Sequence, residues 1–166
     1  MNDETRTYAR IFDRDIAVLE REVALYPDDA SLWKAVEGQP TLGGNLALHL
    51  AGNLRHFIGE VLGGTGFKRN REAEFASRDL PREAVLKEVR AARADVASAL
   101  SKLDPALLDR PFPEAIRGHE LPTRVALIHL CAHLSFHSGQ LDYHRRAATG
   151  DRTSAEPGGF APLLDA

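Results

Sequence analysis

The sequence predicts an all-α protein, a single bundle of four long helices. Four segments of roughly twenty residues repeat apolar side chains at three- and four-residue spacing, the periodicity of an amphipathic helix. Proline- and glycine-rich stretches separate them, and no segment alternates apolar and polar residues as a half-buried strand does. The 166 residues suit one domain, 1–166, with a sizeable core.

The first helix is expected over about residues 5–26, and Pro27 ends it because proline cannot continue the hydrogen-bond ladder. Its apolar stripe consists of Tyr8, Ile11, Phe12, Ile16, Leu19, Val23 and Tyr26. A connector follows, and the second helix fits about 41–62, with Thr41 as its N-cap and Gly63 closing it.

The polar segment 63–80 is expected to be a loop that leads into the third helix, with Asp79 near its cap and Pro81 in its first turn. A proline-rich connector then precedes the fourth helix, about Thr123–Ala148, and the tail 149–166 is expected to be loosely ordered. The second and third connections are long enough to cross over the bundle.

Composition argues against several classes of protein. A formal net charge of −3 gives no reason to expect a nucleic-acid or anionic-membrane partner. The single cysteine, Cys131, excludes an internal disulfide framework and fits a reducing compartment. Neither a secretory signal nor a bilayer-spanning apolar run is visible, so we expect a cytoplasmic protein without a membrane partner.

The fourth helix contains four histidines in the stretch "LIHLCAHLSFHSGQLDYHRR". His129, His133 and His137 are four residues apart, so each is offset from the next by only about 40° around the helix. Gln140 and His144 fall on the same stripe by the same rotation. Cys131 lies about 160° away from His133 and is not expected to join them.

Apolar residues flank this stripe on both sides: Leu130, Leu134 and Leu141 on one, Phe136 and Tyr143 on the other. The stripe should therefore point inward, where imidazoles without partners are costly. Two histidines at i and i+4 can hold one metal ion from a single helix face. Core histidines that hydrogen-bond to protein groups are the alternative interpretation.

The second helix offers a third ligand in "GGNLALHLAGNLRHF". His49 sits among leucines and lies four residues from both Asn45 and Asn53, and His56 lies near the same face. Three histidines would leave coordination positions open, as catalytic metal sites do. Of the remaining histidines, His129 is expected in the core or supporting the site, His144 at a solvent-facing helix end, and His119 in solvent.

Two motifs carry a family resemblance. "CAHLSFHSGQLDYHRR" resembles the closing-helix signature H-x-x-x-H-x-G-Q of the DinB-like (YfiT-like) superfamily, and "LALHLAGNLRHFIG" resembles its second-helix motif. The segment "GNLRHFIGEVLGGTGFKRNREAEF" further resembles the subgroup known as DUF1572. One departure is Ser138, where many relatives carry His or Arg, which puts the substrate contact of that position in doubt.

The resemblance implies an up-down-down-up four-helix bundle, a homodimer, and a metal site formed by His49, His133 and His137. The metal it implies is a divalent ion, zinc or nickel first, with manganese or iron as further candidates. Related proteins transfer or isomerise small-molecule substrates with low-molecular-weight thiols such as bacillithiol, mycothiol or glutathione.

Other motifs give weaker signals. "GGTGFKRN" follows a helix and lacks the Gly-Lys-Ser/Thr ending of a phosphate-binding loop. In "RNREAEF", Arg69 and Arg71 could gate a cleft, but surface ion pairs are the favoured interpretation. Ferritin-like Glu-x-x-His pairs are missing, and Leu134 replaces the glutamate of an H-E-x-x-H protease motif.

Two classes of function remain. The first is a metal-dependent transferase or hydrolase in which the ion activates bound water or thiol for attack on a small electrophile. No catalytic side chain is assigned in it, and Gln140, Asn45, Asn53 and His129 are the candidates for supporting the site. The second is a non-catalytic dimeric bundle that binds metal for structure or sensing; the missing fourth protein ligand argues against it.

Overall fold

The structure, a computed structural model, describes residues 3–155 and 159–164. Its helical elements are α1 (Asp3–Ala24), α2 (Asp29–Leu32), α3 (Gly43–Leu54), the π-helix η1 (Arg55–Glu60), α4 (Arg71–Ala76), α5 (Arg82–Ser101), the 3-10 helix η2 (Pro105–Leu107), α6 (Thr123–Thr149) and α7 (Ala161–Leu164). The described residues contain no strand, so the predicted all-α class is confirmed.

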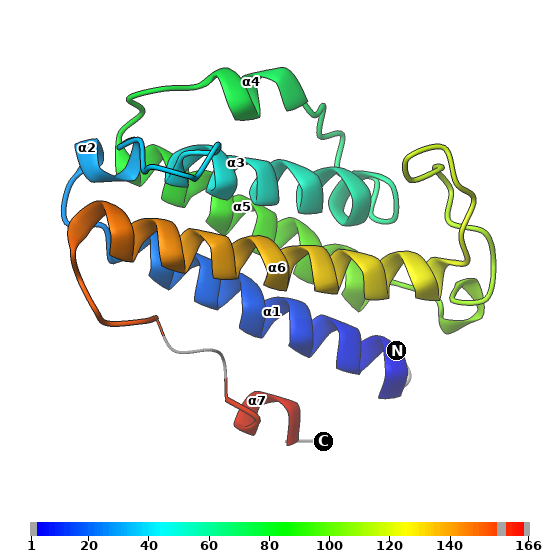
Figure 1. Cartoon of the computed structure of the whole chain (residues 1–166). Helices are drawn as coiled ribbons and strands as arrows, with labels where there is room; N and C mark the ends of the chain where they lie inside the picture. Colours follow the sequence, from blue (N-terminus) through cyan, green and yellow to red (C-terminus); the bar gives the residue numbers. More distant parts are fainter. Residues whose placement is uncertain (1–2, 156–158, 165–166) are drawn as a thin grey trace.

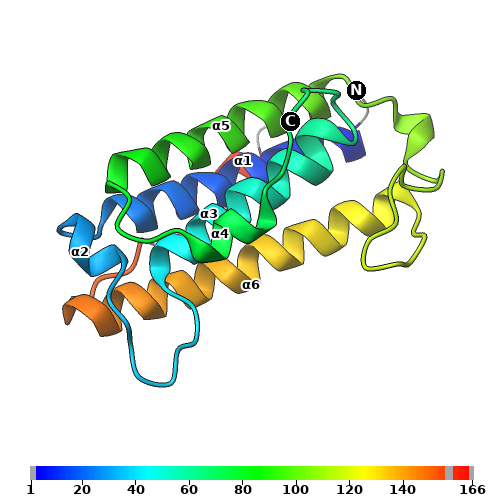
Figure 2. The same cartoon turned by 90° about the horizontal axis from the view of Figure 1, so that it is seen from above.

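The four longest described helices lie side by side along one direction (Figure 1). α1 and α6 run one way, and α3 and α5 run the opposite way, as the two views show (Figures 1 and 2). α1 packs against α5 and α6, and α3 packs against the same two helices, so α1 and α3 are diagonal neighbours. No helix of the described part of the chain is long and apolar enough to cross a membrane.

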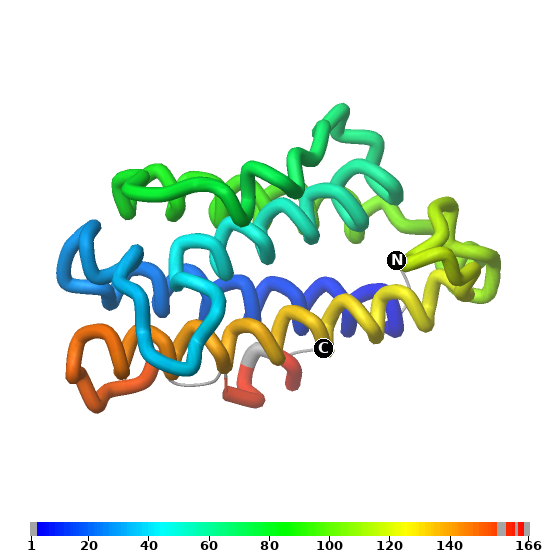
Figure 3. Tube along the Cα trace, turned by 45° about the horizontal axis from the view of Figure 1, so that its top comes forward, coloured from blue at the N-terminus to red at the C-terminus, as the bar shows by residue number. Residues whose placement is uncertain are grey.

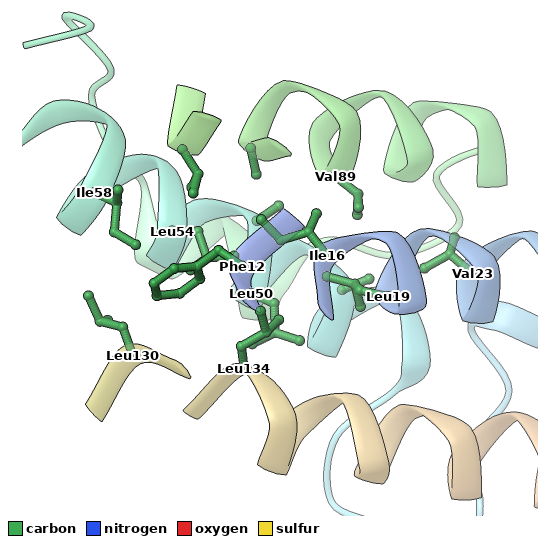
Figure 4. Close-up of a cluster of buried hydrophobic side chains, with 14 of the residues drawn as sticks. Phe12, Ile16, Leu19, Val23, Leu50, Leu54, Ile58, Val89, Leu130 and Leu134 are labelled. Atoms are coloured by element: carbon green, nitrogen blue, oxygen red, sulfur yellow. The ribbon is translucent and has the colours of Figure 1, made fainter. Parts of the chain in front are cut away.

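The core lies between these helices and follows from their apolar stripes (Figure 4). The fully buried side chains shown there include Phe12 and Ile16 of α1, Leu50 and Leu54 of α3, Val89 of α5 and Leu134 of α6. Each stripe repeats at three- and four-residue spacing, so one face of each helix is removed from water. The core thereby fixes how α3 and α6 face each other.

Helix boundaries differ from the prediction in detail. Leu42 rather than Thr41 precedes α3, and no side chain caps that end. Pro81 stands before the first turn of α5 and not within it. The cap expected near Asp79 comes instead from Asp29, whose Oδ1 accepts a hydrogen bond from the backbone N of Arg82 at 2.8 Å.

The connection from η1 to α5 crosses over the bundle, as was expected of the second connection, but it is not a loop throughout (Figure 3). It runs back along the whole bundle, so that α3 and α5 point the same way (Figure 3). The segment expected to be a loop contains α4, which lies on α3. The side chain of Asn70 caps α4 by accepting from Ala73 N, and Glu74 is its buried residue.

The connection from α5 to α6 was also expected to be long enough to cross over the bundle, but it stays at one end, because α5 ends where α6 begins (Figure 1). Near the C-terminal end of α6, Arg145 is fully buried and binds Glu22, Asp151 and the carbonyl oxygen of Thr153. These contacts hold the first residues of the tail that was expected to be loosely ordered. The rest of that expectation falls partly on residues 156–158 and 165–166, which lie outside the described residues.

Candidate metal centre

Three histidines from two facing helices meet at one point. His49 comes from the middle of α3, and His133 and His137 come from successive turns of α6. Their candidate ligand atoms all lie within 4.8 Å of one another. His49 is buried, and the other two are partly exposed. The structure thus brings together the three residues that the spacing of the sequence singled out.

Two of the rings are held by oxygen atoms that can only accept a hydrogen bond. Glu74 Oε2 lies 3.0 Å from His49 Nδ1, and Gln140 Oε1 lies 2.6 Å from His137 Nδ1. Each Nδ1 must therefore carry the proton, because a neutral imidazole has one donor and one acceptor nitrogen. Consequently His49 and His137 each keep a lone pair on Nε2.

His133 completes the set of donors. Its Nε2 lies 3.4 Å from His49 Nε2, and its ring centroid lies 4.5 Å from that of His137. Its Nδ1 is buried and has no hydrogen-bond partner among the described residues. With the proton on Nδ1, His133 also presents a lone pair to the centre. Three converging imidazole nitrogens fit a divalent transition metal such as zinc or nickel.

Burial favours the neutral forms of His133 and His137, which metal ligation requires. Burial and the neighbouring His137 and His49 lower the pKa of His133 to about 4. Burial also lowers the pKa of His137, although the hydrogen bond to Gln140 opposes this. Protons therefore compete weakly with a metal ion for both rings near neutral pH.

Glu74 and Arg69 form a layer behind His49 that sequence reasoning missed. Arg69 Nε and Nη2 donate to the two carboxylate oxygens of Glu74 at 2.7 and 2.8 Å. Burial alone would raise the pKa of Glu74, but the hydrogen bonds from Arg69 and His49 outweigh it and the pKa is lowered. Glu74 is thus an anion, which orients His49 and makes it a stronger ligand.

Arg69 corrects an expectation. It was assigned to the surface, yet its side chain is only 12% exposed. Its Nη2 also lies 3.2 Å from His49 Nδ1. Both of these nitrogens carry protons, so neither accepts from the other, and each donates its hydrogen bond to Glu74. Arg71, in contrast, is exposed and lies over the ring of Phe75.

A glycine in α3 allows the carboxylate of Glu74 to lie close to the helix backbone. Gly52 lies one turn after His49, and a Cβ at this position would collide with the Glu74 carboxylate. Asn45 lies one turn before His49 and donates through Nδ2 to the carbonyl oxygens of Glu74 and Ser77, at 2.8 and 3.0 Å. Asn45 therefore holds α4 in place over the histidines, which is indirect support for the site.

The other candidate residues divide between the site and its surroundings. Gln140 contacts a histidine of the cluster directly. Asn53 is buried, and its Oδ1 has no hydrogen-bond partner in the described part of the chain. His129 is exposed and not in the core, with its ring centroid 6.2 Å from that of His133. His56 lies outside the cluster, with Nε2 3.0 Å from Glu114 Oε1.

His144 was expected at a solvent-facing helix end, and this was wrong. It is fully buried because the connector after α2 covers this end of α6. Its Nε2 lies 3.0 Å from the carbonyl oxygen of Lys34 and 3.2 Å from the backbone N of Gly43, and its Nδ1 lies 2.7 Å from the Tyr26 hydroxyl. These bonds make His144 a structural residue, whereas His119 is exposed as expected.

Cys131 points away from the histidines, as its helical angle predicted. It packs against the hydrophobic core on the side of α1, near Asp15 and Arg14. Burial raises the pKa of its thiol to about 12, so it carries almost no thiolate at neutral pH.

The fold and the cluster together define a helical bundle that could hold a metal ion between two of its helices. Comparison with known proteins agrees with this class. A family model described as the DinB superfamily matches residues 11–141. The chain therefore belongs to the DinB superfamily.

A solved structure gives the same fold. The crystal structure of a DinB-like protein from Bacillus cereus ATCC 10987 matches with a TM-score of 0.68 and 16% sequence identity. The match covers 85% of this chain and 90% of that chain. A comparison with curated proteins finds no match.

Proposed function

We propose that the chain is a metal-dependent enzyme that binds one divalent ion through His49, His133 and His137. The observation that carries the proposal is the convergence of three imidazole nitrogens, two of them fixed as lone-pair donors by Glu74 and Gln140. When bound, such an ion acts as a Lewis acid and lowers the pKa of a coordinated water or thiol. Zinc or nickel suits three imidazoles best, and manganese or iron are weaker candidates.

The nucleophile comes from outside the chain. Within the described residues the cluster contains no carboxylate or thiol, and Cys131 is half-buried on the opposite side of α6, where desolvation raises the pKa of its thiol to about 12. The reaction is therefore the attack of water or of a low-molecular-weight thiol on a small electrophile. The resemblance to thiol-dependent relatives, and to the DUF1572 subgroup in particular, favours S-transfer over hydrolysis.

The protein supplies position and access. Glu74 and Gln140 hold two of the rings from behind. His133 and His137 are partly exposed, so small molecules can reach the centre. Three protein ligands leave at least one coordination position for substrate, whereas a structural zinc site normally has four closed ligands.

We also propose that the chain forms a homodimer. The support is the family resemblance together with large apolar side chains on the outer face of α6, where Val125 and Ile128 are 42% and 54% exposed. Exposed apolar patches of this kind commonly mark interfaces.

Metal content tests the ligand assignment. Dialysed wild-type protein should hold about one divalent ion per chain by elemental analysis, and His133→Ala should hold almost none, because two ligands bind far more weakly than three. His129→Ala is the matched control, since it removes an exposed histidine one turn away on the same helix. Full metal content in His133→Ala would refute the proposed site.

Turnover tests the enzymatic role. Electrophile panels with glutathione, bacillithiol, mycothiol or no thiol should give activity that disappears on chelation and in His49→Ala. Activity only with a thiol indicates a transferase, and activity without one indicates a hydrolase. A protein that binds metal through four closed ligands and turns over nothing would instead be the non-catalytic bundle.

A further inference from the structure

A cavity of about 430 Å³ lies between α6, the start of α3 and the connector that precedes α3. Its walls include Leu46, Phe136, Gln140 and Tyr143, with Gln39 and Thr41 on the connector side. We propose that this cavity binds the uncharged, flat and largely apolar body of the substrate. Its volume falls within the range of about 300–1,000 Å³ typical of small-molecule sites.

Aromatic side chains form the outer wall of the cavity. Phe136 and Tyr143 are 64% and 67% exposed, although they are large and apolar. They lie two turns apart on α6, and Gly139 lies between them. A Cβ at Gly139 would meet no atom within 4 Å, so the space between the two rings is open down to the helix backbone. A planar ligand can lie against bare backbone there, with an aromatic ring at each end.

The lining selects against charge. None of the side chains that line the cavity is ionisable at neutral pH, and the polar ones are Gln39, Thr41 and Gln140, with the Tyr143 hydroxyl at the rim. Arg146 lies close to Tyr143 but outside the lining, and it pairs with Asp142 at 3.4 Å. An anionic ligand would therefore lose hydration without gaining a partner, whereas a neutral ligand gains apolar contact and neutral hydrogen bonds.

Gln140 joins the cavity to the histidine cluster. Its side chain lines the cavity, and its Oε1 accepts the hydrogen bond from His137 Nδ1 at 2.6 Å. A ligand in the cavity thus lies next to the residue that holds one of the three histidines. The role of the cavity as the substrate site rests on the proposed function, but the binding of a neutral aromatic ligand does not.

A pair of fluorescent probes tests the proposal directly. N-phenylnaphthylamine is neutral, and anilinonaphthalene sulfonate has the same ring body with one added sulfonate. With metal-free wild-type protein, we expect the neutral probe to bind at one site and at least tenfold more tightly than the anionic probe. Equal affinity for the two probes, or no binding of the neutral one, would overturn the proposal.

Variants locate the probe. Phe136→Ala and Tyr143→Ala should each weaken binding of the neutral probe about tenfold or more, because each removes one aromatic wall. Leu107→Ala is the matched control: it removes an apolar side chain that is 46% exposed in η2 and lies outside the cavity, and binding should stay within about twofold. All three positions are exposed, so the variants should fold, as their circular dichroism spectra would verify.

Two results would show that Phe136 and Tyr143 do not bind the probe. If Phe136→Ala and Tyr143→Ala bind the probe as well as wild type, the cavity is not the site. If they halve the mass in light scattering and leave probe binding unchanged, this face is an interface between copies. A failure of the metal proposal would look different. In that case the wild-type protein would bind no ion, but the neutral probe would still bind wild type and His133→Ala equally well.

Discussion

Glu74→Gln is the substitution that best separates a metal centre from a group of core histidines. The carboxylate is 7% exposed, lies 3.0 Å from His49 Nδ1 and is held by Arg69. Glutamine has the same size and keeps an oxygen acceptor, so the local packing is preserved. It loses the negative charge, however, and leaves the Arg69 guanidinium uncompensated beside the ring.

The expected magnitude follows from these contacts. Removing the group that hydrogen-bonds a metal-ligating histidine typically weakens metal affinity about 10–100-fold. This corresponds to about 1.4–2.7 kcal/mol of binding free energy. The uncompensated charge of Arg69 acts in the same direction, because it repels a cation and draws electron density away from His49. We therefore expect Glu74→Gln to reach the upper part of this range.

Competition titration with zinc and a chromophoric chelator measures the effect. Glu72→Gln is the matched control, since it neutralises an exposed carboxylate on the same short helix and should bind zinc as wild type does. Thermal unfolding of each metal-free protein shows whether the fold is intact. Zinc affinity in Glu74→Gln within about twofold of wild type and of Glu72→Gln would refute the proposed role of the carboxylate.

Three further outcomes concern the rest of the molecule. Light scattering at micromolar concentration should give about twice the chain mass of 18.2 kDa, and a mass near 18.2 kDa would mean a monomer. Cys131→Ser should keep full metal content and turnover, because burial holds the thiol protonated on the far side of α6; loss of either would contradict this. Burial lowers the pKa of His144 below its ordinary value of 6.5, so below that pH the unfolded chain takes up a proton that the folded chain does not. The free energy of unfolding should therefore fall as the pH drops through about 6.5, and urea unfolding of metal-free protein should show a smaller fall in His144→Gln; equal falls would count against it.

The long helices and the histidine cluster were accessible to sequence reasoning because both depend on periodicity. A stripe of apolar residues predicts which face of a helix is buried, and the spacing of His133 and His137 places both rings on that face. His49 could be singled out because it stands among leucines on another helix of the same kind. In each case a local pattern along one helix carries the information.

Two expectations were wrong for the same physical reason: that His144 lies at a solvent-facing helix end, and that His129 lies in the core, which was one of its two expected places. Helical rotation gives the angle of a side chain around its own helix, but not what lies opposite it at that level of the bundle. His144 is buried because the connector after α2 covers it, and its partners Tyr26 and Lys34 are more than a hundred residues away in sequence. His129 has the right angle but is exposed.

Glu74 and Arg69 were missed because α4 is too short to show a periodic pattern. Its local signals are Asn70 as an N-cap and acidic residues in the first turn, both favourable at a helix start. These signals predict at most a marginal helix, since six residues cannot form a stable helix alone. Contacts with α3, including those of Asn45, stabilise it, and such contacts cannot be read from the local sequence.

The topology of the bundle explains why Glu74 and Arg69 lie beside His49. Because α3 and α5 run in the same direction, the chain between them must return along the length of the bundle (Figures 1 and 3). It returns over α3, and this path places Glu74 and Arg69 next to Nδ1 of His49. A connection that stayed at one end, like that between α5 and α6, would leave His49 Nδ1 without a carboxylate. The crossing segment is thus part of the site, and α3 and α6 alone would supply the three nitrogens without the anion that orients one of them.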